Sequence, residues 1–186
     1  MHGPSGPCPL HERSFLVEVQ VIEATPVAPP PPSQDDVRLV VASKPDEAAR
    51  VIFNFNKHAL AAAMRAIGFT SVVVTYTGDG DSGQIDEIGF QPPDIEEGLN
   101  KAVVAQMRYR WDEERHCGCS ELVFEEMHLG SIAEALCDTA ISFGGHDGYE
   151  NNDGGSGQFT LQASDASAIL EHTDYYTESY TTTHEL

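Results

Sequence analysis

The sequence predicts an α+β fold in which an antiparallel sheet, made of a central hairpin and C-terminal strands, packs against two to three helices. Two patterns support this prediction. Apolar residues recur at helical steps in the middle of the chain, and β-branched or alternating residues mark the hairpin and the C-terminal third. With 186 residues, 40% of them hydrophobic, the chain is long enough to bury one core. We therefore expect a single domain over residues 35–186.

A proline-rich arm is expected to precede this domain over residues 1–34. The arm holds eight of the eleven prolines, and the stretch from Thr25 to Gln34 predicts a stiff polyproline-like linker. Alternating residues predict one short strand over Phe15–Ile22. No apolar run matches a signal peptide or reaches the roughly 20 residues of a membrane span. We therefore expect a cytoplasmic protein without membrane contact.

The first clear helix is expected to begin at Ser43 and to end at Gly68. Ser43 can cap it, and a proline and an aspartate follow in the first turn. Residues Thr70–Tyr76 then predict a β-branched strand, and the turn-forming stretch Thr77–Gln84 leads into a second strand over Ile85–Phe90. We expect these two strands to pair as a hairpin.

Two further helices are expected in the middle of the chain. Asp94 can cap a helix over Ile95–Glu114, and apolar residues at helical steps predict another over Glu121–Phe143, with a weak point at Gly130. The turn between them reads His116-Cys117-Gly118-Cys119, which lacks the C-x2-C or H-x3-H spacing that is usual in zinc sites. We interpret it as a helix-to-helix turn whose thiols are reduced.

Strands are expected to follow the glycine-rich loop Gly144–Gly157. They cover Gln158–Ala163, Ser167–His172 and Tyr175–Thr183. Only three residues separate the first two strands, which predicts a second hairpin.

A short sequence motif occurs twice in the chain, once in the central turn and once in this loop, and we call this pair of copies the echo. Residues Asp79–Ile85 read DGDSGQI and residues Asp153–Phe159 read DGGSGQF, and each copy opens a strand. Two copies do not make a repeat array, which needs three or more units. They indicate turns of similar geometry, which we expect to lie together at one end of the sheet.

The two loop sequences, GDGDSGQI and GYENNDGGSGQF, and the closing strands that end in HEL resemble a family of uncharacterised bacterial proteins known as a domain of unknown function. The resemblance covers Asp46–Leu186 and leaves out the proline-rich arm. It implies a type of domain and brings no established activity.

The glycine-rich loops supply the candidate binding residues. Carboxylates spaced by glycine on flexible backbone suit a hard cation such as Ca²⁺ or another divalent ion, and the metal candidates are Asp79, Asp81, His146 and Asp153. The wider set of loop candidates is Asp79, Asp81, Ser82, Gln84, Tyr149, Glu150, Asn151, Asn152 and Asp153. The alternative is that these side chains cap their own turns.

A hydrolytic site is a second interpretation of the same loops, with His146 as base or metal ligand beside nearby carboxylates. Against it, the sequence contains no nucleophile elbow, P-loop, zinc-protease helix or dinucleotide fingerprint. The loop from Asp79 also departs from the EF-hand pattern at Gln84 and Phe90. We therefore assign no catalytic residue and expect a protein without enzymatic activity or cofactor.

The charge of the chain carries the leading functional hypothesis. Lys and Arg number 10 and Asp and Glu number 30, so the net charge is −20. Such a chain should neither bind phosphate backbones directly nor adhere to anionic lipid. Solubility requires a magnitude of only about 2–8. We hypothesise a binding protein, an inhibitor or accessory protein, that imitates nucleic acid and engages the basic surface of a partner. A divalent-metal protein or metal-dependent hydrolase is the alternative, and evenly spread charge without a partner is the plainest interpretation.

Arg108, Tyr109, Arg110 and Trp111 form a cluster in which basic and aromatic residues alternate. Arg and Trp are enriched at interface hot spots, so these four residues are the candidates for partner binding. The alternative is a solvated helix on which the arginines pair with acidic residues one turn away.

Overall fold

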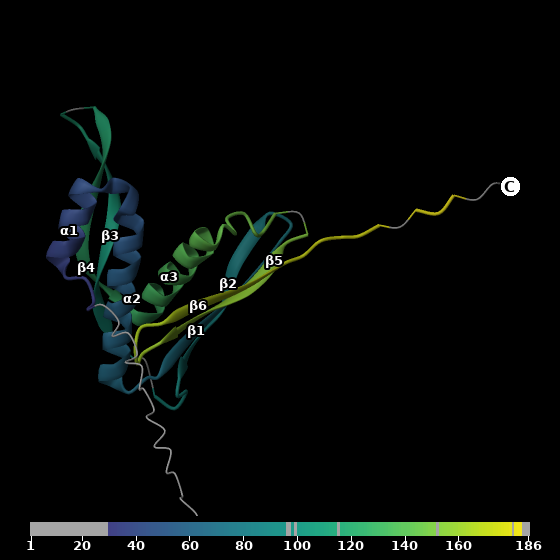
Figure 1. Cartoon of the computed structure of the whole chain (residues 1–186), viewed down its shortest axis with the longest axis horizontal. Helices are drawn as coiled ribbons and strands as arrows, with labels where there is room; N and C mark the ends of the chain where they lie inside the picture. The colour runs from purple at the N-terminus through teal and green to yellow at the C-terminus, as the bar shows by residue number, and fades with distance from the viewer. Residues whose placement is uncertain are drawn as a thin grey trace, which may run out of the picture. The chain divides into compact units, whose positions relative to one another are not determined.

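The computed structural model describes residues 30–95, 98, 100–114, 116–151, 153–179 and 181–183. The chain divides into two units, Met1–Pro30 and Pro31–Leu186, and the elements all belong to the second unit. In chain order they are α1 (Gln34–Ser43), η1 (Pro45–Glu47), α2 (Ala48–Ile67), β1 (Ser71–Asp79), β2 (Ser82–Gln91), β3 (Lys101–Asp112), β4 (Cys117–His128), α3 (Leu129–Gly144), β5 (Gly155–Gln162) and β6 (Ala168–Asp174) (Figure 1). The expected strand over Phe15–Ile22 lies outside the described residues.

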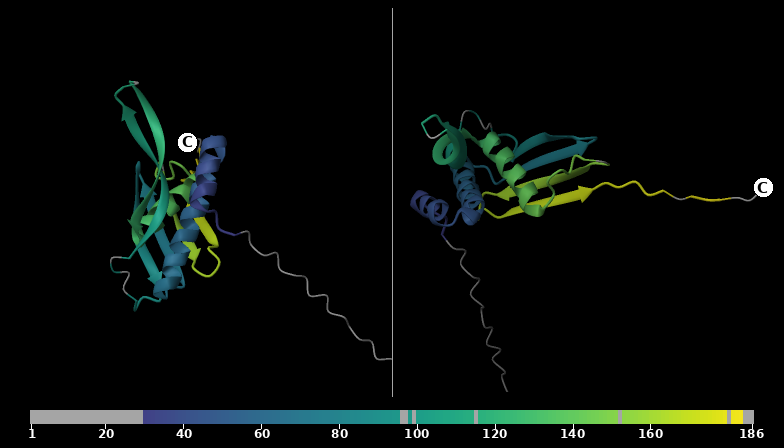
Figure 2. Two further views of the ribbon diagram at one scale, coloured as in Figure 1. Left: turned by 90° about the vertical axis from the view of Figure 1, so that its left-hand side faces the viewer. Right: turned by 90° about the horizontal axis from the view of Figure 1, so that it is seen from above.

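The larger sheet has four antiparallel strands in the order β2-β1-β5-β6. Both expected hairpins are confirmed, because β1 pairs with β2 and β5 pairs with β6. On β1 the inward side chains Val72, Val74 and Tyr76 are buried against the helices, while the residues between them are partly or fully exposed. Helix α3 lies across this inner face (Figure 2). A second sheet consists of β3 and β4, so the chain has an α+β fold.

The core is entirely apolar and lies between α2, α3 and the inner face of the larger sheet. Leu60 and Met64 of α2 and Leu136 and Ile141 of α3 are among the core residues.

Among the described residues, no helix is both long and apolar enough to cross a membrane.

The expected helix over residues 43–68 ends as predicted but begins later. Gly68 adopts a left-handed conformation with φ 104°, and its N–H donates to the carbonyls of Met64 and Arg65. Ser43 does not cap this helix. It is the last residue of α1, where its hydroxyl donates to the Leu39 carbonyl at 2.6 Å. Because Pro45 interrupts the backbone ladder after Ser43, a 3-10 turn separates the two helices.

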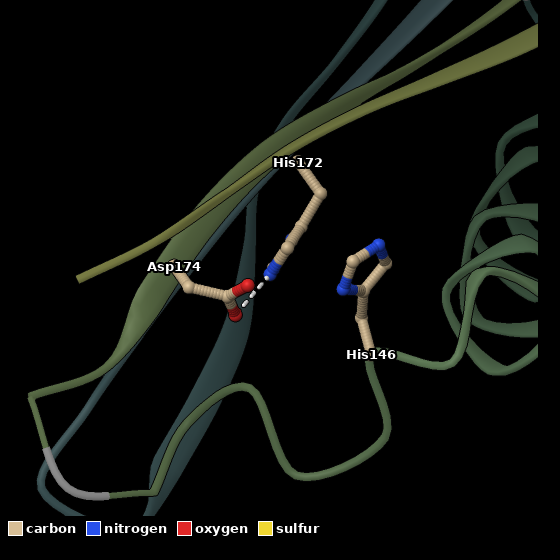
Figure 3. Close-up of side chains that lie close together, drawn as sticks. All are labelled: His146, His172 and Asp174. Atoms are coloured by element: carbon tan, nitrogen blue, oxygen red, sulfur yellow. Dashed lines mark hydrogen bonds and ion pairs between the residues drawn. The ribbon is translucent and has the colours of Figure 1, made fainter. Parts of the chain in front are cut away.

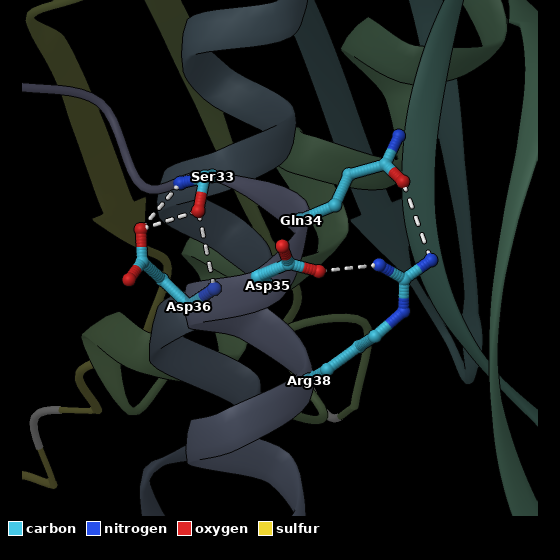
Figure 4. Close-up of polar contacts among 5 residues, drawn as sticks. All are labelled: Ser33, Gln34, Asp35, Asp36 and Arg38. Carbon is cyan, nitrogen blue, oxygen red and sulfur yellow. Dashed lines mark hydrogen bonds and ion pairs between the residues drawn. The ribbon is translucent and has the colours of Figure 1, made fainter.

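Helix α1 begins with a capping box that explains why the expected linker stops at residue 33. The Ser33 hydroxyl accepts the N–H of Asp36 at 3.2 Å, and the Asp36 carboxylate accepts the N–H of Ser33 at 2.8 Å (Figure 4). The Ser33 hydroxyl also donates to the Asp36 carboxylate at 2.6 Å. This bond, followed by the one from the Ser33 N–H, holds the pKa of the Asp36 carboxyl below its usual value. Arg38 also pairs with Asp35 at 2.9 Å.

The expected helix over residues 95–114 is wrong, because Lys101–Asp112 forms strand β3. This strand pairs with β4 over its full length, from Lys101 opposite His128 to Asp112 opposite Cys117. The residues of β3 include good helix formers such as Ala, Gln, Met and Arg, and local propensity therefore favoured a helix. Residues 101–112 form a strand instead, because they pair with residues 117–128 of β4.

The expected helix over residues 121–143 is right only in its second part. Residues 117–128 form β4, and α3 begins at Leu129, next to the expected weak point at Gly130. His116, Cys117 and Cys119 therefore do not lie in a helix-to-helix turn. They lie at the β3–β4 turn and on the first residues of β4, and both cysteines are free and exposed.

The expected strand over residues 175–183 is also wrong. Strand β6 ends at Asp174, and residues 175–179 and 181–183 form no ladder. Tyr175 still donates its N–H to the Gly154 carbonyl at 2.9 Å, and Thr177 donates to Asp153. Hydrogen bonds to one loop, from both backbone and side-chain groups, hold this segment in place of a strand ladder.

Candidate functional site

Three potential metal ligands meet between the end of α3 and strand β6. One ligand atom each from His146, His172 and Asp174 lies within 4.8 Å of the other two. The rings of the two histidines are 3.9 Å apart, and Nε2 of His172 lies 3.0 Å from the Asp174 carboxylate (Figure 3). The His172 side chain is only 3% exposed, while that of Asp174 is 72% exposed. We call these three residues the His146–His172–Asp174 cluster.

Local structure fixes each member of the cluster. His172 and Asp174 are two residues apart on β6, and the alternation of a strand places both side chains on one face of the sheet. His146 follows the left-handed Gly145 that ends α3, and its N–H donates back to the Ile141 carbonyl at 3.1 Å. This helix-ending motif aims the chain so that the His146 ring lies against the sheet.

Tyr76 forms the support behind His172. Its hydroxyl lies 2.8 Å from Nδ1 of His172, and the two rings are stacked with an interplanar angle of 13°. Burial, followed by the nearby Cys137, Tyr149 and Asp174, raises the pKa of Tyr76 to about 12. The phenol is therefore neutral at physiological pH and acts as a hydrogen-bond partner, which fixes the orientation of the imidazole.

The electrostatic environment of the cluster is anionic. Strands β1, β2, β5 and β6 and helix α3 contain no lysine or arginine. They contain the acidic residues Asp79, Asp86, Glu87, Glu134, Asp138, Glu171 and Asp174. A cation near the cluster therefore meets no fixed positive charge on these five elements.

The two loops of the echo flank the same strand, as the sequence predicts. Gly78 of β1 pairs with Gly83 on one side and with Gly155 on the other. The glycine of each S-G-Q motif lies beneath a tyrosine: a Cβ on Gly83 would lie 2.5 Å from Oη of Tyr149, and one on Gly157 would collide with Oη of Tyr76. In both copies of the echo, the glycine of the S-G-Q motif leaves room for an aromatic ring that lies directly on the backbone of the strand.

A cavity of about 370 Å³ lies where the two loops meet. Its lining residues are Thr77, Gly78, Asp79, Ser82, Gly83, Gln84, Asp153 and Tyr175. Thr77 and Asp79 alternate along β1 with Tyr76 and Gly78, so their side chains face away from α3 and from the His146–His172–Asp174 cluster. The cavity and the cluster therefore lie on opposite faces of the sheet.

Some of the predicted loop residues line this cavity, and the others lie in the turns next to it. Asp79, Ser82, Gln84 and Asp153 line the cavity. Both carboxylate oxygens of Asp153 are already engaged, by the N–H of Thr177 at 2.5 Å and by its hydroxyl at 3.0 Å.

The other loop candidates hold the turns together. Asp81 has φ 91° and donates its N–H to the Glu150 carbonyl at 3.0 Å. Tyr149 covers Gly83, and the Asn151 amide donates to the Gly148 carbonyl at 2.9 Å. Asn152 lies outside the described residues.

Of the four predicted metal ligands, His146 lies in the cluster, and Asp79, Asp81 and Asp153 belong to the turns and the cavity. Sequence reasoning missed His172 and Asp174. The predicted strand ended at His172, two residues before Asp174, and β6 extends to Asp174. The available signal was the H-x-D spacing, because a strand that continues through it places both side chains on one face. The approach of His146 could come only from the tertiary structure.

The predicted partner-binding residues lie on the outer half of β3. Tyr109 is 73% exposed and Trp111 is 49% exposed. Arg108 forms an ion pair with Glu125 across the strand pair. The helical interpretation of this cluster, with pairs one turn apart, is wrong because the arginines alternate along a strand.

Comparison with known proteins identifies the domain. No curated protein and no solved structure matches the chain significantly. A model of a family of unknown function, DUF6878, matches residues 52–186, from within α2 to the C-terminus. This confirms the resemblance to a domain without established activity, and because the match spans well over half of the chain, the protein belongs to the DUF6878 family of unknown function.

Proposed function

We propose that this protein binds a divalent transition metal ion at the His146–His172–Asp174 cluster. The observation that carries the proposal is the convergence of two imidazoles and one carboxylate within 4.8 Å. Nε2 of His172 and a carboxylate oxygen of Asp174 would be ligands, together with one ring nitrogen of His146. The Tyr76 hydroxyl at Nδ1 of His172 supplies the outer partner that metal-bound histidines usually have.

The donor set indicates the class of metal. Imidazole nitrogens suit Zn²⁺, Co²⁺, Ni²⁺ and Cu²⁺, whereas Ca²⁺ prefers six to eight oxygen ligands. The cluster offers two nitrogens and one carboxylate, so it favours a zinc-like ion over the calcium ion that the loop carboxylates suggested. Three protein ligands leave further coordination positions for water or another small ligand.

Binding would tie together three parts of the chain. His146 belongs to the segment that follows α3, the other two ligands belong to the last strand, and Tyr76 belongs to β1. An ion held by all of these elements stabilises the folded state by mass action, because the unfolded chain does not assemble the site. The proposed role is therefore metal binding that also fixes β6 on the sheet.

The test is isothermal titration calorimetry of the EDTA-treated full chain with ZnCl₂, and separately with CaCl₂. Because exposed Cys117 and Cys119 can hold zinc themselves, the titrations use the Cys117→Ser/Cys119→Ser background. We expect one Zn²⁺ site and no Ca²⁺ site. Asp174→Asn and His146→Gln should each weaken Zn²⁺ binding at least tenfold. Tyr76→Phe should weaken it about tenfold, as expected for an outer partner of a ligand.

His128→Gln is the matched control, because His128 is an exposed histidine at the end of β4 and belongs to a different sheet. It should leave the Zn²⁺ affinity unchanged. The proposal fails if the background protein binds no Zn²⁺, or if the His128 variant weakens binding as much as the cluster variants do.

A second candidate function rests on the charge distribution. We propose that the surface formed by the larger sheet and α3, which has no lysine or arginine, engages a basic surface of a partner protein. The protein would then act as an inhibitor or accessory protein that imitates nucleic acid. Its exposed free cysteines support the proposal that it acts in the reducing cytoplasm.

A cationic peptide of about 20 residues, rich in Lys and Arg, is a suitable probe for this second candidate, with its Kd measured between low and high NaCl concentration. Affinity for a localised anionic surface should fall steeply with salt. Glu171→Gln/Asp86→Asn, on β6 and β2, should weaken binding more than Asp35→Asn/Glu47→Gln on the helical side, although each pair removes the same charge. Equal effects of the two pairs would mean that only net charge matters and would contradict a specific surface.

A further inference from the structure

Two exposed cysteines share one face at the start of β4. Cys117 and Cys119 are separated by one residue, and alternation along a strand places side chains two residues apart on the same face. Both thiols are free and exposed. The strand pairing holds both positions, because Cys117 lies opposite Asp112 and Cys119 opposite Arg110 of β3. The β3–β4 hairpin therefore presents two thiols side by side.

The aromatic side chains of the hairpin lie on the other face. Gly118, between the two cysteines, faces away from the thiols, and the Tyr109 ring lies directly over it, so that a Cβ on Gly118 would collide with Oη of Tyr109. Trp111 is the ladder partner of Gly118 and shares its face. Neither ring therefore covers the thiols.

The spacing of the two thiols suits an ion between them better than a disulfide. Two steps of an extended strand separate the Cα atoms by roughly 6.7 Å, at the upper end of the about 4.4–6.8 Å found across disulfides. A disulfide would also bring the two sulfurs to about 2.0 Å. Two sulfurs that each bind one metal ion at about 2.3 Å stay up to about 4.6 Å apart. The strand pairing of β4 can therefore remain intact around an ion.

We infer that Cys117 and Cys119 bind one Cu⁺ ion through two thiolates. Soft thiolate ligands select Cu⁺. Two S–H bonds break and two Cu–S bonds form, the two protons pass to solvent, and no electron is transferred. The Cys119 thiol donates only a weak bond to the Arg110 carbonyl, at 3.4 Å, so little is lost when its proton leaves. The site is independent of the proposed metal binding, because β4 belongs to the other sheet.

The number of ligands distinguishes this ion from zinc. Structural zinc sites have four protein ligands and catalytic zinc sites have three. Among the described residues, only the His146–His172–Asp174 cluster brings three potential ligand atoms within 4.8 Å of one another. The hairpin therefore offers a pair of ligands. A Zn²⁺ ion bound there would be incompletely coordinated, whereas two thiolates satisfy Cu⁺.

The strand pairing also places opposite charges beside the two thiols. Arg110 lies across from Cys119 and Asp112 lies across from Cys117, so both share the face of the thiols. A Cu⁺ ion between two thiolates forms a complex of charge −1. The Arg110 guanidinium stabilises this complex at one end, while Asp112 favours the arriving cation at the other. The two charges thus leave the selection of the ion to the thiolates.

The test is a competition for Cu⁺ between the full chain and the chromophoric chelator bicinchoninate, in degassed buffer with ascorbate as the reductant. All variants carry Cys8→Ser, because Cys8 is a fourth thiol and lies outside the described residues. We expect one Cu⁺ per chain. Cys117→Ser and Cys119→Ser should each weaken binding by more than the roughly 10–100-fold that loss of an outer partner of a ligand costs.

The matched control moves one thiol to the other face of the strand. Cys119→Ser/Ser120→Cys keeps the number of thiols but places them three residues apart, so that their side chains lie on opposite faces. It should bind Cu⁺ as weakly as Cys119→Ser alone. Cys137→Ala removes a buried thiol and His146→Gln removes a residue of the cluster, and both should leave the Cu⁺ affinity unchanged. Circular dichroism verifies that each variant is folded.

The outcomes separate this inference from the proposed function. Retention of all Cu⁺ by the chelator overturns the inference, as does equal affinity of the parent chain and the variant with thiols on opposite faces. Loss of Cu⁺ binding in His146→Gln alone also overturns it, because the ion would then belong to the cluster. A chain that binds Cu⁺ through its two cysteines but no Zn²⁺ at the cluster supports the inference and contradicts only the proposed function.

Discussion

Asn56 and Ala105, 49 residues apart, are joined by two hydrogen bonds that make a helix side chain act as the neighbour of a strand. The Asn56 amide satisfies both backbone groups of Ala105, at 2.8 and 2.9 Å. Ala105 is fully buried, so neither group can turn to water instead. This contact docks the two-stranded sheet on α2 and fixes which residues of β3 face outward.

Replacing Asn56 should therefore destabilise the fold. Asn56→Leu keeps the volume but leaves the N–H and C=O of Ala105 buried without partners, and we expect a loss of about 1–3 kcal/mol in the free energy of unfolding. Asn54→Leu, an exposed position two residues earlier on α2, is the control and should change it by less than about 0.5 kcal/mol. Denaturant unfolding monitored by circular dichroism measures both. Similar losses for the two variants would show that the Asn56 bonds are not important.

Tyr149 and Gly83 provide a second test of packing. Because a Cβ on Gly83 would lie 2.5 Å from Oη of Tyr149, Gly83→Ala should cost about 1–3 kcal/mol. In the Tyr149→Phe background the cost should be smaller, and a double-mutant cycle by denaturant unfolding gives the coupling. Gly89→Ala on the same strand, where a Cβ meets its nearest atom only at 4.0 Å, should be tolerated. Additive costs in the cycle would rule out the proposed contact.

The cysteines should differ sharply in reactivity. Burial, together with the nearby Asp138 and Glu134, raises the pKa of the Cys137 thiol to about 12, and its side chain has no exposed surface. Cys117 and Cys119 are exposed. Iodoacetamide at pH 8 should therefore modify Cys117 and Cys119 in the native protein and leave Cys137 unmodified until guanidinium is added. Peptide mass spectrometry reads out each site, and rapid native labelling of Cys137 would contradict its burial.

The raised pKa values of Cys137 and Tyr76 predict that the protein loses stability in alkali. The pKa of Cys137 is raised from 9.0 to about 12, and that of Tyr76 from 10.0 to about 12. The unfolded chain therefore loses these protons first, so the free energy of unfolding is unaffected below pH 9 and falls as the pH rises towards 12. Urea unfolding between pH 8 and pH 11 measures the slope. Cys137→Ala should make it shallower, and an unchanged slope would assign the effect to other groups.

Asp153 should control the segment that follows β6. Its carboxylate accepts both the N–H and the hydroxyl of Thr177, so Asp153→Ala should release residues 175–179. Limited proteolysis or hydrogen exchange of these residues should become several-fold faster. Asp79→Ala is the control, because Asp79 lines the same cavity without bonding to this segment. If Zn²⁺ affinity survives both Asp153→Ala and Asp79→Ala, neither of these loop carboxylates is a metal ligand.

The sequence alone determined those elements whose signals are local. Gly68 marked the end of α2, the β-branched residues from Val72 to Val74 marked β1, and short turns predicted both hairpins. The echo also predicted that the two loops meet, and each of its copies opens a strand that pairs with β1. These features depend on backbone conformation and side-chain period, which neighbouring residues encode.

Only the tertiary structure decided the identity of β3 and the composition of the site. Residues 101–112 favour a helix locally, but they pair along their whole length with β4, and Asn56 joins them to α2. His146 and His172 lie 26 residues apart in the sequence, and a helix end and a strand edge bring their rings within 3.9 Å. Strand pairing and side-chain convergence depend on contacts between distant residues, and a local pattern does not contain that information.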